Sequence, residues 1–294
     1  MPIRITLDLF SGRPNPTVTL SDREAKSILA RLAPDKKLSR DQAESPPSLG
    51  YRGLIIEQSG RPGRGLPKVF RLSADRLYGA NLAHLVAEPG LEEELLTRPG
   101  FLKKFGVRGL TPAQLEKLIR YRYRLFHRWH WHGHFPKRPV CPCAPVYEPA
   151  WWNDGGQRQG GNNCYNYGCN YRTDTFAQPG QASGAMYGFP IDGPGVKNGA
   201  IHDDLIDAPG ANNKCPRSGG HLVALVIAPS SSFNDFHWYR KGLNGRWTHK
   251  PGGTQATNLD NSGNLITDPR TADRGPYTQF TTFMIVKHGH IKIK

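Results

Sequence analysis

The sequence lacks any apolar run of the roughly 20 residues that a membrane-spanning helix needs. Residues Met1 to Leu9 also lack the basic start and the continuous apolar stretch of a signal peptide, and they alternate apolar and polar side chains instead. Such alternation is typical of a half-buried strand. We therefore expect no transmembrane segment and a protein that is cytoplasmic when made, with export by a route without a cleaved signal left open.

Apolar residues are few, at 37% of the 294 residues, whereas glycine (33) and proline (25) are common. This composition is typical of loop-rich proteins with short strands and argues against a helical bundle. The length fits one or two domains. We predict the α+β class, with a small α+β domain at residues 1–105, a basic helix and His/Trp/Pro-rich linker at 106–149, and a second domain at 150–294.

Local patterns predict the elements of the first domain. Ser21 and Glu24 match a capping box, which indicates a helix that runs to about Leu32, after a cluster of turn-forming residues at 11–16. The expected strands are 3–10, 17–20, 51–57 and 67–72. We find no catalytic constellation in this part of the sequence and expect it to serve in packing, docking or partner recognition.

Acidic residues are scarce, since 24 Asp and Glu stand against 39 Lys and Arg, a net charge of +15 (39 − 24). Residues 103–138 hold ten Lys or Arg and one acidic residue, Glu116. Thr111, Pro112 and Gln114 are typical of a helix start, and basic residues line the helix expected after them. We expect this stretch either to bind an anionic polymer or to form a solvated basic surface.

Four histidines follow this helix and are interleaved with tryptophan, at positions 127, 130, 132 and 134. Histidine-rich tracts can hold a transition metal, and basic tracts of this kind can contact nucleic acid or anionic lipid. The sequence does not define the ligands of a metal site. No cofactor is expected.

Five cysteines lie in the second half of the chain, at positions 141, 143, 164, 169 and 215. An odd number leaves at least one thiol free or paired with another chain. In a reducing compartment, the simplest expectation is that all five are thiols. The Cys141-Pro142-Cys143 spacing is too tight for an ordinary pair of zinc ligands.

Cys164 is the candidate nucleophile. Asn162 and Asn163 are good helix caps, so we expect Cys164 at the start of a short helix, where the partial positive charge lowers a thiol pKa. The alternative is a buried structural cysteine, or a disulfide with Cys169 or Cys215.

A thiol hydrolase also needs donors for the oxyanion of its intermediate. A side-chain amide from Gln157, Gln159 or Asn163, together with the backbone N–H of Cys164, can supply them. Gln159 and Asn163 are the candidates that we select.

His221 is the candidate base, because it opens the apolar strand expected at 221–228, 57 residues after Cys164 (221 − 164). A strand end can aim an imidazole at a helix start, although a hydrogen-bonded structural histidine is the alternative. We select His237, on the next expected strand, to orient the ring of His221. The other candidates for this third position are Asp235, His249, Asp203 and Asp204.

The segment Asn258 to Leu265 matches the first eight positions of a calcium loop, with oxygen-bearing side chains at positions 1, 3 and 5 and Gly263 at position 6. The acidic ligand of position 12 is replaced by Pro269, and Asp268 is one residue short. A turn built on Asn and Asp side chains is the favoured interpretation.

Several blocks of the second domain, in order, resemble a family of mostly uncharacterised bacterial proteins that also includes animal insoluble matrix shell proteins. The similarity covers roughly residues 160–285 and implies no catalytic residues, since none is established for that family. The matching blocks are Asn162-Asn163-Cys164-Tyr165-Asn166-Tyr167, Thr175-Phe176-Ala177-Gln178-Pro179-Gly180, Gly220-His221-Leu222-Val223-Ala224-Leu225-Val226, Asp235-Phe236-His237-Trp238-Tyr239-Arg240 and Asp260-Asn261-Ser262-Gly263-Asn264.

Cys164 and the Gly220-His221-Leu222-Val223-Ala224 string also resemble the cysteine and the Gly-His-Val-Ala strand of the NlpC/P60 and CHAP amidase-peptidases. This looser resemblance implies a papain-like second domain, in which a helix packs on an antiparallel sheet. It also implies that Cys164 is the nucleophile, His221 the base, and a polar residue of the next strand the orienting group.

The leading hypothesis is a cysteine-dependent amidase or peptidase that acts through an acyl-thioester on a peptide-like substrate, such as a cell-wall peptide. The rival is a non-catalytic basic module that binds an anionic polymer (nucleic acid, cell wall, or mineral and matrix) through residues 103–138, with or without a calcium loop.

Overall fold

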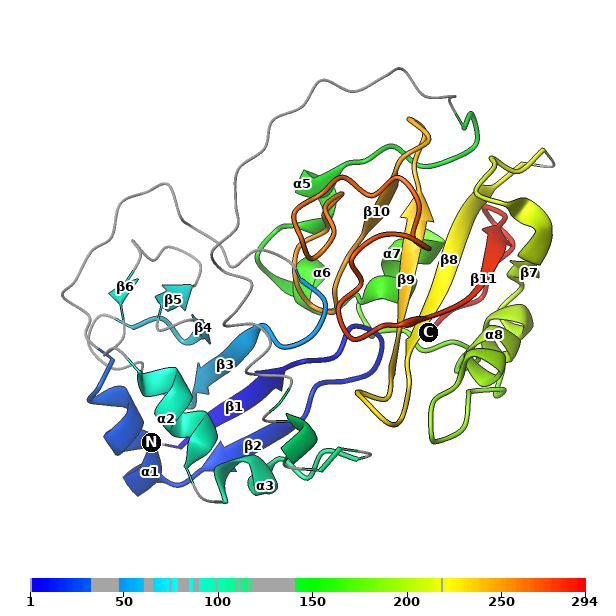
Figure 1. The fold of residues 1–294 in the computed structure, drawn as a ribbon. Helices are drawn as coiled ribbons and strands as arrows, with labels where there is room; N and C mark the ends of the chain where they lie inside the picture. Colours follow the sequence, from blue (N-terminus) through cyan, green and yellow to red (C-terminus); the bar gives the residue numbers. More distant parts are fainter. Residues whose placement is uncertain are drawn as a thin grey trace. The chain divides into compact units, whose positions relative to one another are not determined.

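The structure, a computed structural model, describes residues 2–32, 48–60, 66–73, 76–78, 85–86, 90–98, 100–108, 110–111, 113–115, 117, 141–217 and 219–294. The chain divides into two compact units. The first comprises residues 1–9, 15–46 and 51–124, and the second comprises 10–14, 47–50 and 125–294. Each contains an antiparallel sheet and helices, which confirms the α+β class (Figure 1).

The sheet of the first unit has six strands in the order β2-β1-β3-β4-β5-β6. Along β1, the alternating residues Ile3, Ile5 and Leu7 are fully buried, as the alternation in the sequence predicts. The strands are β1 (Ile3–Asp8), β2 (Thr17–Leu20), β3 (Gly53–Gln58), β4 (Val69–Ser73), β5 (Arg76–Tyr78) and β6 (Leu85–Val86).

The helices of the first unit are α1 (Asp22–Leu29), α2 (Leu91–Thr97) and α3 (Phe101–Lys104). The capping box predicted for α1 is present, because the backbone N–H of Ser21 donates to Glu24. A second predicted box also forms, in which the N–H of Gln114 donates to Thr111 Oγ1 at 3.2 Å. The rest of the expected basic helix, with the histidines at 127–134, lies outside the described residues.

A buried ion pair network fixes the centre of this sheet. The carboxylate of Asp8 on β1 accepts from Arg52 at 2.6 Å and also from Arg71 on β4. Burial by itself would raise the pKa of Asp8, but the two guanidinium groups outweigh it and hold the pKa well below its usual range.

The sheet of the second unit has five strands in the order β10-β9-β8-β11-β7. Its central strand β8 is buried along its whole length, as a continuous apolar run predicts. The strands are β7 (Ile206–Asp207), β8 (His221–Ala228), β9 (Asp235–Lys241), β10 (Trp247–His249) and β11 (Gln279–Val286).

Two helices of the second unit, α7 (Cys164–Cys169) and α8 (Gly193–His202), pack on one face of this sheet and share one hydrophobic core with it. Val223, Leu225 and Trp238 supply the sheet side of this core. The opposite face carries His237 and Tyr239, which alternate with Trp238 along β9. The short helices α5 (Pro149–Trp152) and α6 (Gln157–Gly160) lie between residue 141 and α7 in sequence, and η2 (Pro209–Ala211) follows β7.

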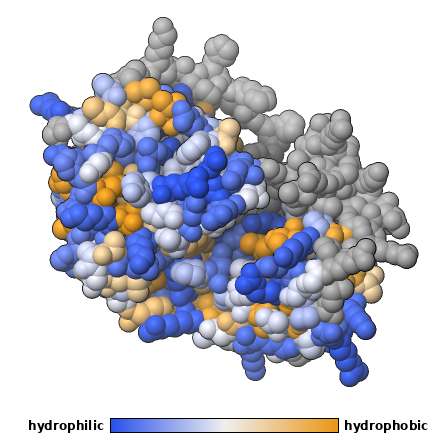
Figure 2. Space-filling view, turned by 180° about the vertical axis from the view of Figure 1, so that it is seen from behind, coloured by the Kyte–Doolittle hydropathy of each residue, from blue (hydrophilic) through white to orange (hydrophobic). Residues whose placement is uncertain are grey.

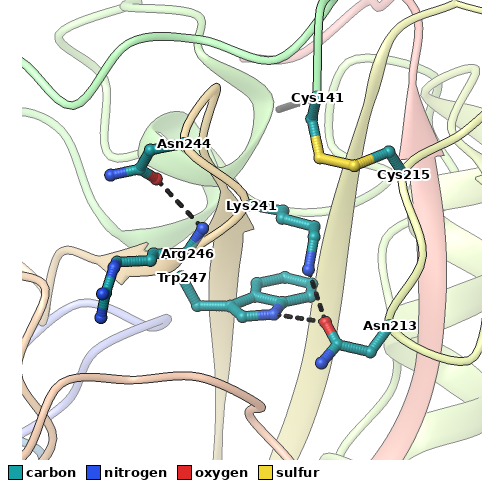
Figure 3. The surroundings of a disulfide bond; sticks show 7 residues. All are labelled: Cys141, Asn213, Cys215, Lys241, Asn244, Arg246 and Trp247. Carbon is teal, nitrogen blue, oxygen red and sulfur yellow. Dashed lines mark hydrogen bonds between the residues drawn. A yellow bond between two sulfur atoms is a disulfide. The ribbon is translucent and has the colours of Figure 1, made fainter. Parts of the chain in front are cut away.

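Residues 141–149, which we expected in the linker, belong to the second unit. Cys141 forms a disulfide with Cys215, so the expectation that all five cysteines are thiols is wrong. Asn213, two residues before Cys215, accepts hydrogen bonds from Lys241 at 2.6 Å and from the Trp247 indole at 2.7 Å (Figure 3). The disulfide therefore ties residue 141 to the segment that holds the β9–β10 hairpin.

Two short segments from the N-terminal part of the sequence are also built into the second unit, at residues 10–14 and 47–50. Leu49, for example, exchanges two backbone hydrogen bonds with the side chain of Asn261. The two units therefore include short segments that are distant in sequence, beside the continuous ranges predicted from the sequence.

No helix among the described residues is long and apolar enough to cross a membrane. Figure 2 shows one face of the molecule, on which hydrophobic side chains form separate patches among hydrophilic ones. Single large hydrophobic residues are exposed in the second unit, namely Val146, Trp151, Tyr171, Met186, Phe189, Ile201 and Ile206.

The Asp8 network gives a stability prediction for the first unit. We expect Asp8→Asn to destabilise it by about 3–5 kcal/mol, because two arginines then lie beside an uncharged partner. Since the pKa of Asp8 is lowered in the folded state, the contribution is present above pH ~4 and is lost as the pH falls further. Amide exchange of peptides from β1 and β3, followed by mass spectrometry in urea, measures the change.

Glu57→Gln provides the control, because Glu57 pairs with Arg4 at the exposed surface. This variant should leave the exchange of β1 and β3 almost unchanged. Equal exchange in the Asp8 and Glu57 variants would contradict the assignment.

Candidate functional site

Helix α7 places the candidate nucleophile. Asn163 is its N-cap, as predicted, and its side-chain oxygen accepts from the N–H groups of Tyr165 (2.9 Å) and Asn166 (3.1 Å). The side-chain oxygen of Asn166 in turn accepts from the N–H of Asn163, so a reciprocal capping box forms. Before the helix, Lys250 donates to the carbonyl oxygens of Gln159 and Asn162, both at 2.5 Å.

Cys164 is fully buried against β9, where its Sγ lies 4.0 Å from the carbonyl oxygen of Phe236. Burial raises the pKa of this thiol well above its usual value, and the charge of Asp235 raises it further. The expected lowering of the pKa at the helix start is therefore wrong. A buried, protonated thiol is a poor nucleophile.

His221 lies at the other end of α7. Its Nε2 is 2.7 Å from the carbonyl oxygen of Gly168, so Nε2 must carry the proton of this bond. Cys164 instead contacts Phe236, which pairs with Ile227, six residues along β8 from His221. Along α7, Gly168 is four residues from Cys164, about 6 Å of helix, and Cys164 is directed at β9 instead. The structure does not bring the predicted nucleophile and base together as a hydrogen-bonded pair.

His237 lies on the opposite face of the sheet from α7, because it alternates with Phe236 and Trp238 along β9. Its Nε2 is 2.9 Å from Nδ1 of His249, and Nε2 of His249 is 2.9 Å from the carbonyl oxygen of Leu259. The ring of Tyr239 stacks on His249. His237 is therefore not placed to orient His221, and it belongs to a separate buried pair.

The two predicted oxyanion donors have different positions. The side-chain oxygen of Gln159, on the short helix α6, accepts from the N–H of Gly155 at 3.2 Å. The side-chain amide of Asn163 donates to the carbonyl oxygen of Gly12, at 2.8 Å, and is therefore engaged within the protein itself. Gln178 donates to the same Gly12 oxygen at 2.9 Å. In the sequence, Gln178 stands in one of the family-like blocks and Gly12 in a cluster of turn-forming residues, and neither pattern indicates this contact.

Asp235 completes the surroundings of this segment. One carboxylate oxygen accepts from the N–H of Ser11 (2.7 Å) and that of Gly12 (3.3 Å), and the other accepts from the N–H of Arg13 (3.1 Å). Tyr277 donates its hydroxyl to the same carboxylate at 2.5 Å. Burial raises the pKa of Asp235. The backbone of residues 11–13 is therefore hydrogen-bonded through both its N–H and its C=O groups.

The remaining candidates for a third catalytic residue serve other contacts. Asp203 accepts from the Tyr165 hydroxyl at 2.9 Å and from the N–H of Gly180 at 2.7 Å. Asp204 pairs with Lys292 at the surface. Neither is hydrogen-bonded to His221, whose Nδ1 has no partner among the described residues.

The segment that matches a calcium loop forms a turn built on Asp260. Its Oδ1 accepts from the N–H groups of Ser262 and Asn264, and its Oδ2 accepts from the N–H of Asp273. The carboxylate is thus engaged by backbone donors, as in the favoured turn interpretation. Among the described residues, no three His, Cys, Asp or Glu side chains are grouped as metal ligands.

Comparison with known proteins gives a relative that is 46% identical over 144 residues, the insoluble matrix shell protein 1 of the mollusc Ruditapes philippinarum. The aligned stretch covers 48% of this chain and 90% of the relative. The chain belongs to the insoluble matrix shell protein family. The relative is molluscan, so it does not support the bacterial membership that the resemblance suggested. No family model and no solved structure matches the chain, and the likeness to the NlpC/P60 and CHAP amidases is unsupported.

The burial of Cys164 leads to a labelling prediction. At pH 8, iodoacetamide should label the exposed Cys143 at least about 100-fold faster than Cys164, because a buried thiol reacts only after an opening that costs a few kcal/mol. Site-resolved mass spectrometry measures both rates in one sample, and Cys143→Ser is the control for the fast signal. Rapid labelling of Cys164 that His221→Ala slows would contradict this placement and restore the amidase hypothesis.

The buried histidines predict a loss of stability in acid. Burial lowers the pKa of His221 to about 3 and that of His249 to about 4, below the value of about 6.5 expected for the unfolded chain. Between pH 6.5 and 4 the unfolded state therefore binds more protons, and stability falls as the pH falls, by about 1.4 kcal/mol per pH unit for each group. His221→Gln should reduce this slope in urea unfolding of the second unit.

Leu222→Ala provides a matched control, since it removes a buried side chain that does not titrate. It should lower the stability of the second unit equally at each pH and leave the slope as in the wild type. A His221→Gln slope identical to that of the wild type would show that His221 is not buried in its neutral form.

Proposed function

We propose that the chain is a non-catalytic module that binds an anionic polymer of an extracellular matrix. The observation that carries the proposal is the environment of Cys164, whose buried thiol has a raised pKa and, in the part of the chain that the structure describes, no imidazole among its hydrogen-bond partners. A thiol hydrolase requires the opposite, an accessible thiolate with an adjacent base.

The charge distribution supports an anionic partner. Residues 1–140 hold 25 Lys or Arg and 13 acidic residues, an excess of 12, whereas residues 141–294 hold 14 and 11, an excess of 3. Within the basic stretch 103–138, Lys103 and Lys117 are exposed. A dense run of like charges favours a polyanion, because binding releases the counterions that the polymer holds.

Two further observations support a site of action outside the reducing cytosol. The Cys141–Cys215 disulfide is of a kind that persists in oxidising compartments. The relative from Ruditapes philippinarum is named as a matrix shell protein. We therefore propose a matrix polymer as the partner and give no role to a calcium ion at Asp260.

The cysteine amidase is the alternative function. Asn163 and Gln178 donate to one carbonyl oxygen, and two converging amide donors are what an oxyanion hole uses. That function also requires Cys164 to ionise, and the labelling experiment above distinguishes the two proposals.

The binding proposal is tested with heparin, a sulfated polysaccharide. From the counterion relation measured for nucleic acids, we expect the affinity to fall about tenfold between 50 and 200 mM salt for every two charge contacts. Replacing Arg120, Arg124 and Arg128 by Gln should weaken binding at 50 mM salt and make the salt dependence shallower. Titration calorimetry at several salt concentrations measures both quantities.

The matched control replaces three basic residues of the second unit by Gln, at Arg172, Arg270 and Lys292. Each of these residues pairs with an acidic residue. Both triple variants remove three positive charges, but the control leaves the basic stretch 103–138 intact. Equal losses of affinity in the two triple variants, or an affinity that salt does not change, would refute binding through residues 103–138.

A further inference from the structure

The loop of residues 10–14 is held in the second unit as a bound peptide would be. The backbone N–H groups of Ser11, Gly12 and Arg13 all donate to the carboxylate of Asp235. On the other side of the loop, the carbonyl oxygen of Gly12 accepts from Asn163 and Gln178. Five hydrogen bonds therefore hold three consecutive residues through their main chain alone.

The side chains of this loop add selectivity. The ring of Phe10 packs 5.2 Å from that of Phe233, and the guanidinium of Arg13 lies 3.6 Å over the ring of Phe10. A Cβ added to Gly12 would lie 2.5 Å from the ring of Phe236, which is fully buried. The receptor thus fits an aromatic residue at position 10 and glycine at position 12.

The loop of residues 10–14 is joined at both ends to strands of the first unit, although it is bound in the second unit. Residues 10–14 connect β1 and β2 of the first unit, whereas Asn163, Gln178 and Asp235 belong to the second unit. Apart from the segments 10–14 and 47–50, the chain passes between the units only at residues 124–125. Release of the two segments therefore leaves one covalent connection between the units.

We propose that the second unit is a receptor for the Phe10–Pro14 loop, and that it also accepts this loop from a second copy of the chain. Copies then associate by exchanging the loop. A reciprocal exchange gives a dimer, and a one-way exchange gives an open chain of copies. This inference is independent of the proposed polymer binding, because it uses none of the residues in 103–138.

Competition within one chain sets the conditions for exchange. A loop tethered to its own receptor acts at an effective concentration of the order of mM. A free loop therefore enters the receptor only when the resident loop has been prevented from binding. Variants that disable one side of the interaction at a time meet this condition.

Two full-length variants test the exchange. Gly12→Val should keep the receptor but prevent its own loop from binding, because the added side chain collides with Phe236. Asp235→Asn should keep the loop but weaken the receptor, because one carboxylate oxygen is replaced by an amide group. Each variant alone should have the mass of a single chain in light scattering, and an equimolar mixture should form a complex of twice that mass.

A mixture that keeps the single-chain mass, while circular dichroism shows both variants folded, would overturn the proposal. If either variant fails to fold, a peptide of residues 9–15 is titrated into the Gly12→Ala chain. The native peptide should bind at least about tenfold more tightly than to wild type, since the resident loop no longer competes. Equal binding of a peptide that carries Gly12→Val, or no binding at all, would refute the receptor.

Discussion

The carboxylate of Asp235 is the constraint on which the second unit depends. A buried carboxylate must be satisfied by donors, and here three come from the backbone of residues 11–13 and a fourth from the hydroxyl of Tyr277. These partners are 42 and more than 220 residues away in sequence. Asp235 is the first residue of β9. Its side chain therefore links this strand to Tyr277, just before β11, and to the loop of residues 10–14.

Buried polar groups need hydrogen-bond partners, and in this protein several residue types that are often catalytic serve that need. Lys250 is fully buried and donates to carbonyl oxygens ahead of α7. His249 and His237 form a buried pair, and burial lowers the pKa of His249, so its neutral form is favoured. Cys164 has the position in sequence that a nucleophile would have, but its thiol faces β9. Catalysis would need solvent access and a nearby imidazole, and the packing of α7 on β9 denies Cys164 the first.

Positive charge is unevenly distributed along the chain. A disulfide and a hydrogen-bonded turn on Asp260 tie the second unit together, and residues 141–294 carry an excess of only 3 of the 15 positive charges. The basic residues are instead concentrated before residue 141. This division agrees with the two proposals, in which the charged stretch binds a polymer and the loop of residues 10–14 is exchanged between copies.

Local patterns in the sequence determined much of the secondary structure. The alternation in β1, the apolar run of β8 and the caps at Ser21, Thr111 and Asn163 were all predicted, because each depends on residues within one or two turns of chain. Helix α8 was missed, since glycine and proline make Gly193–His202 a poor helix by propensity. Its glycines are explained by tertiary packing, because a Cβ at Gly199 would meet the backbone of Pro179.

The candidate site was decided by tertiary structure. The spacing of 57 residues does not reveal that His221 contacts the end of α7, whereas Cys164 is at its start. Strand alternation places His237 on the opposite face of the sheet. The partner of Cys141 and the receptor of loop 10–14 likewise depend on contacts between distant segments. The sequence by itself thus determined the α+β class, the caps and the main strands. Only the packed structure decided which polar groups meet, because a buried group takes whichever partner the fold brings within hydrogen-bond distance.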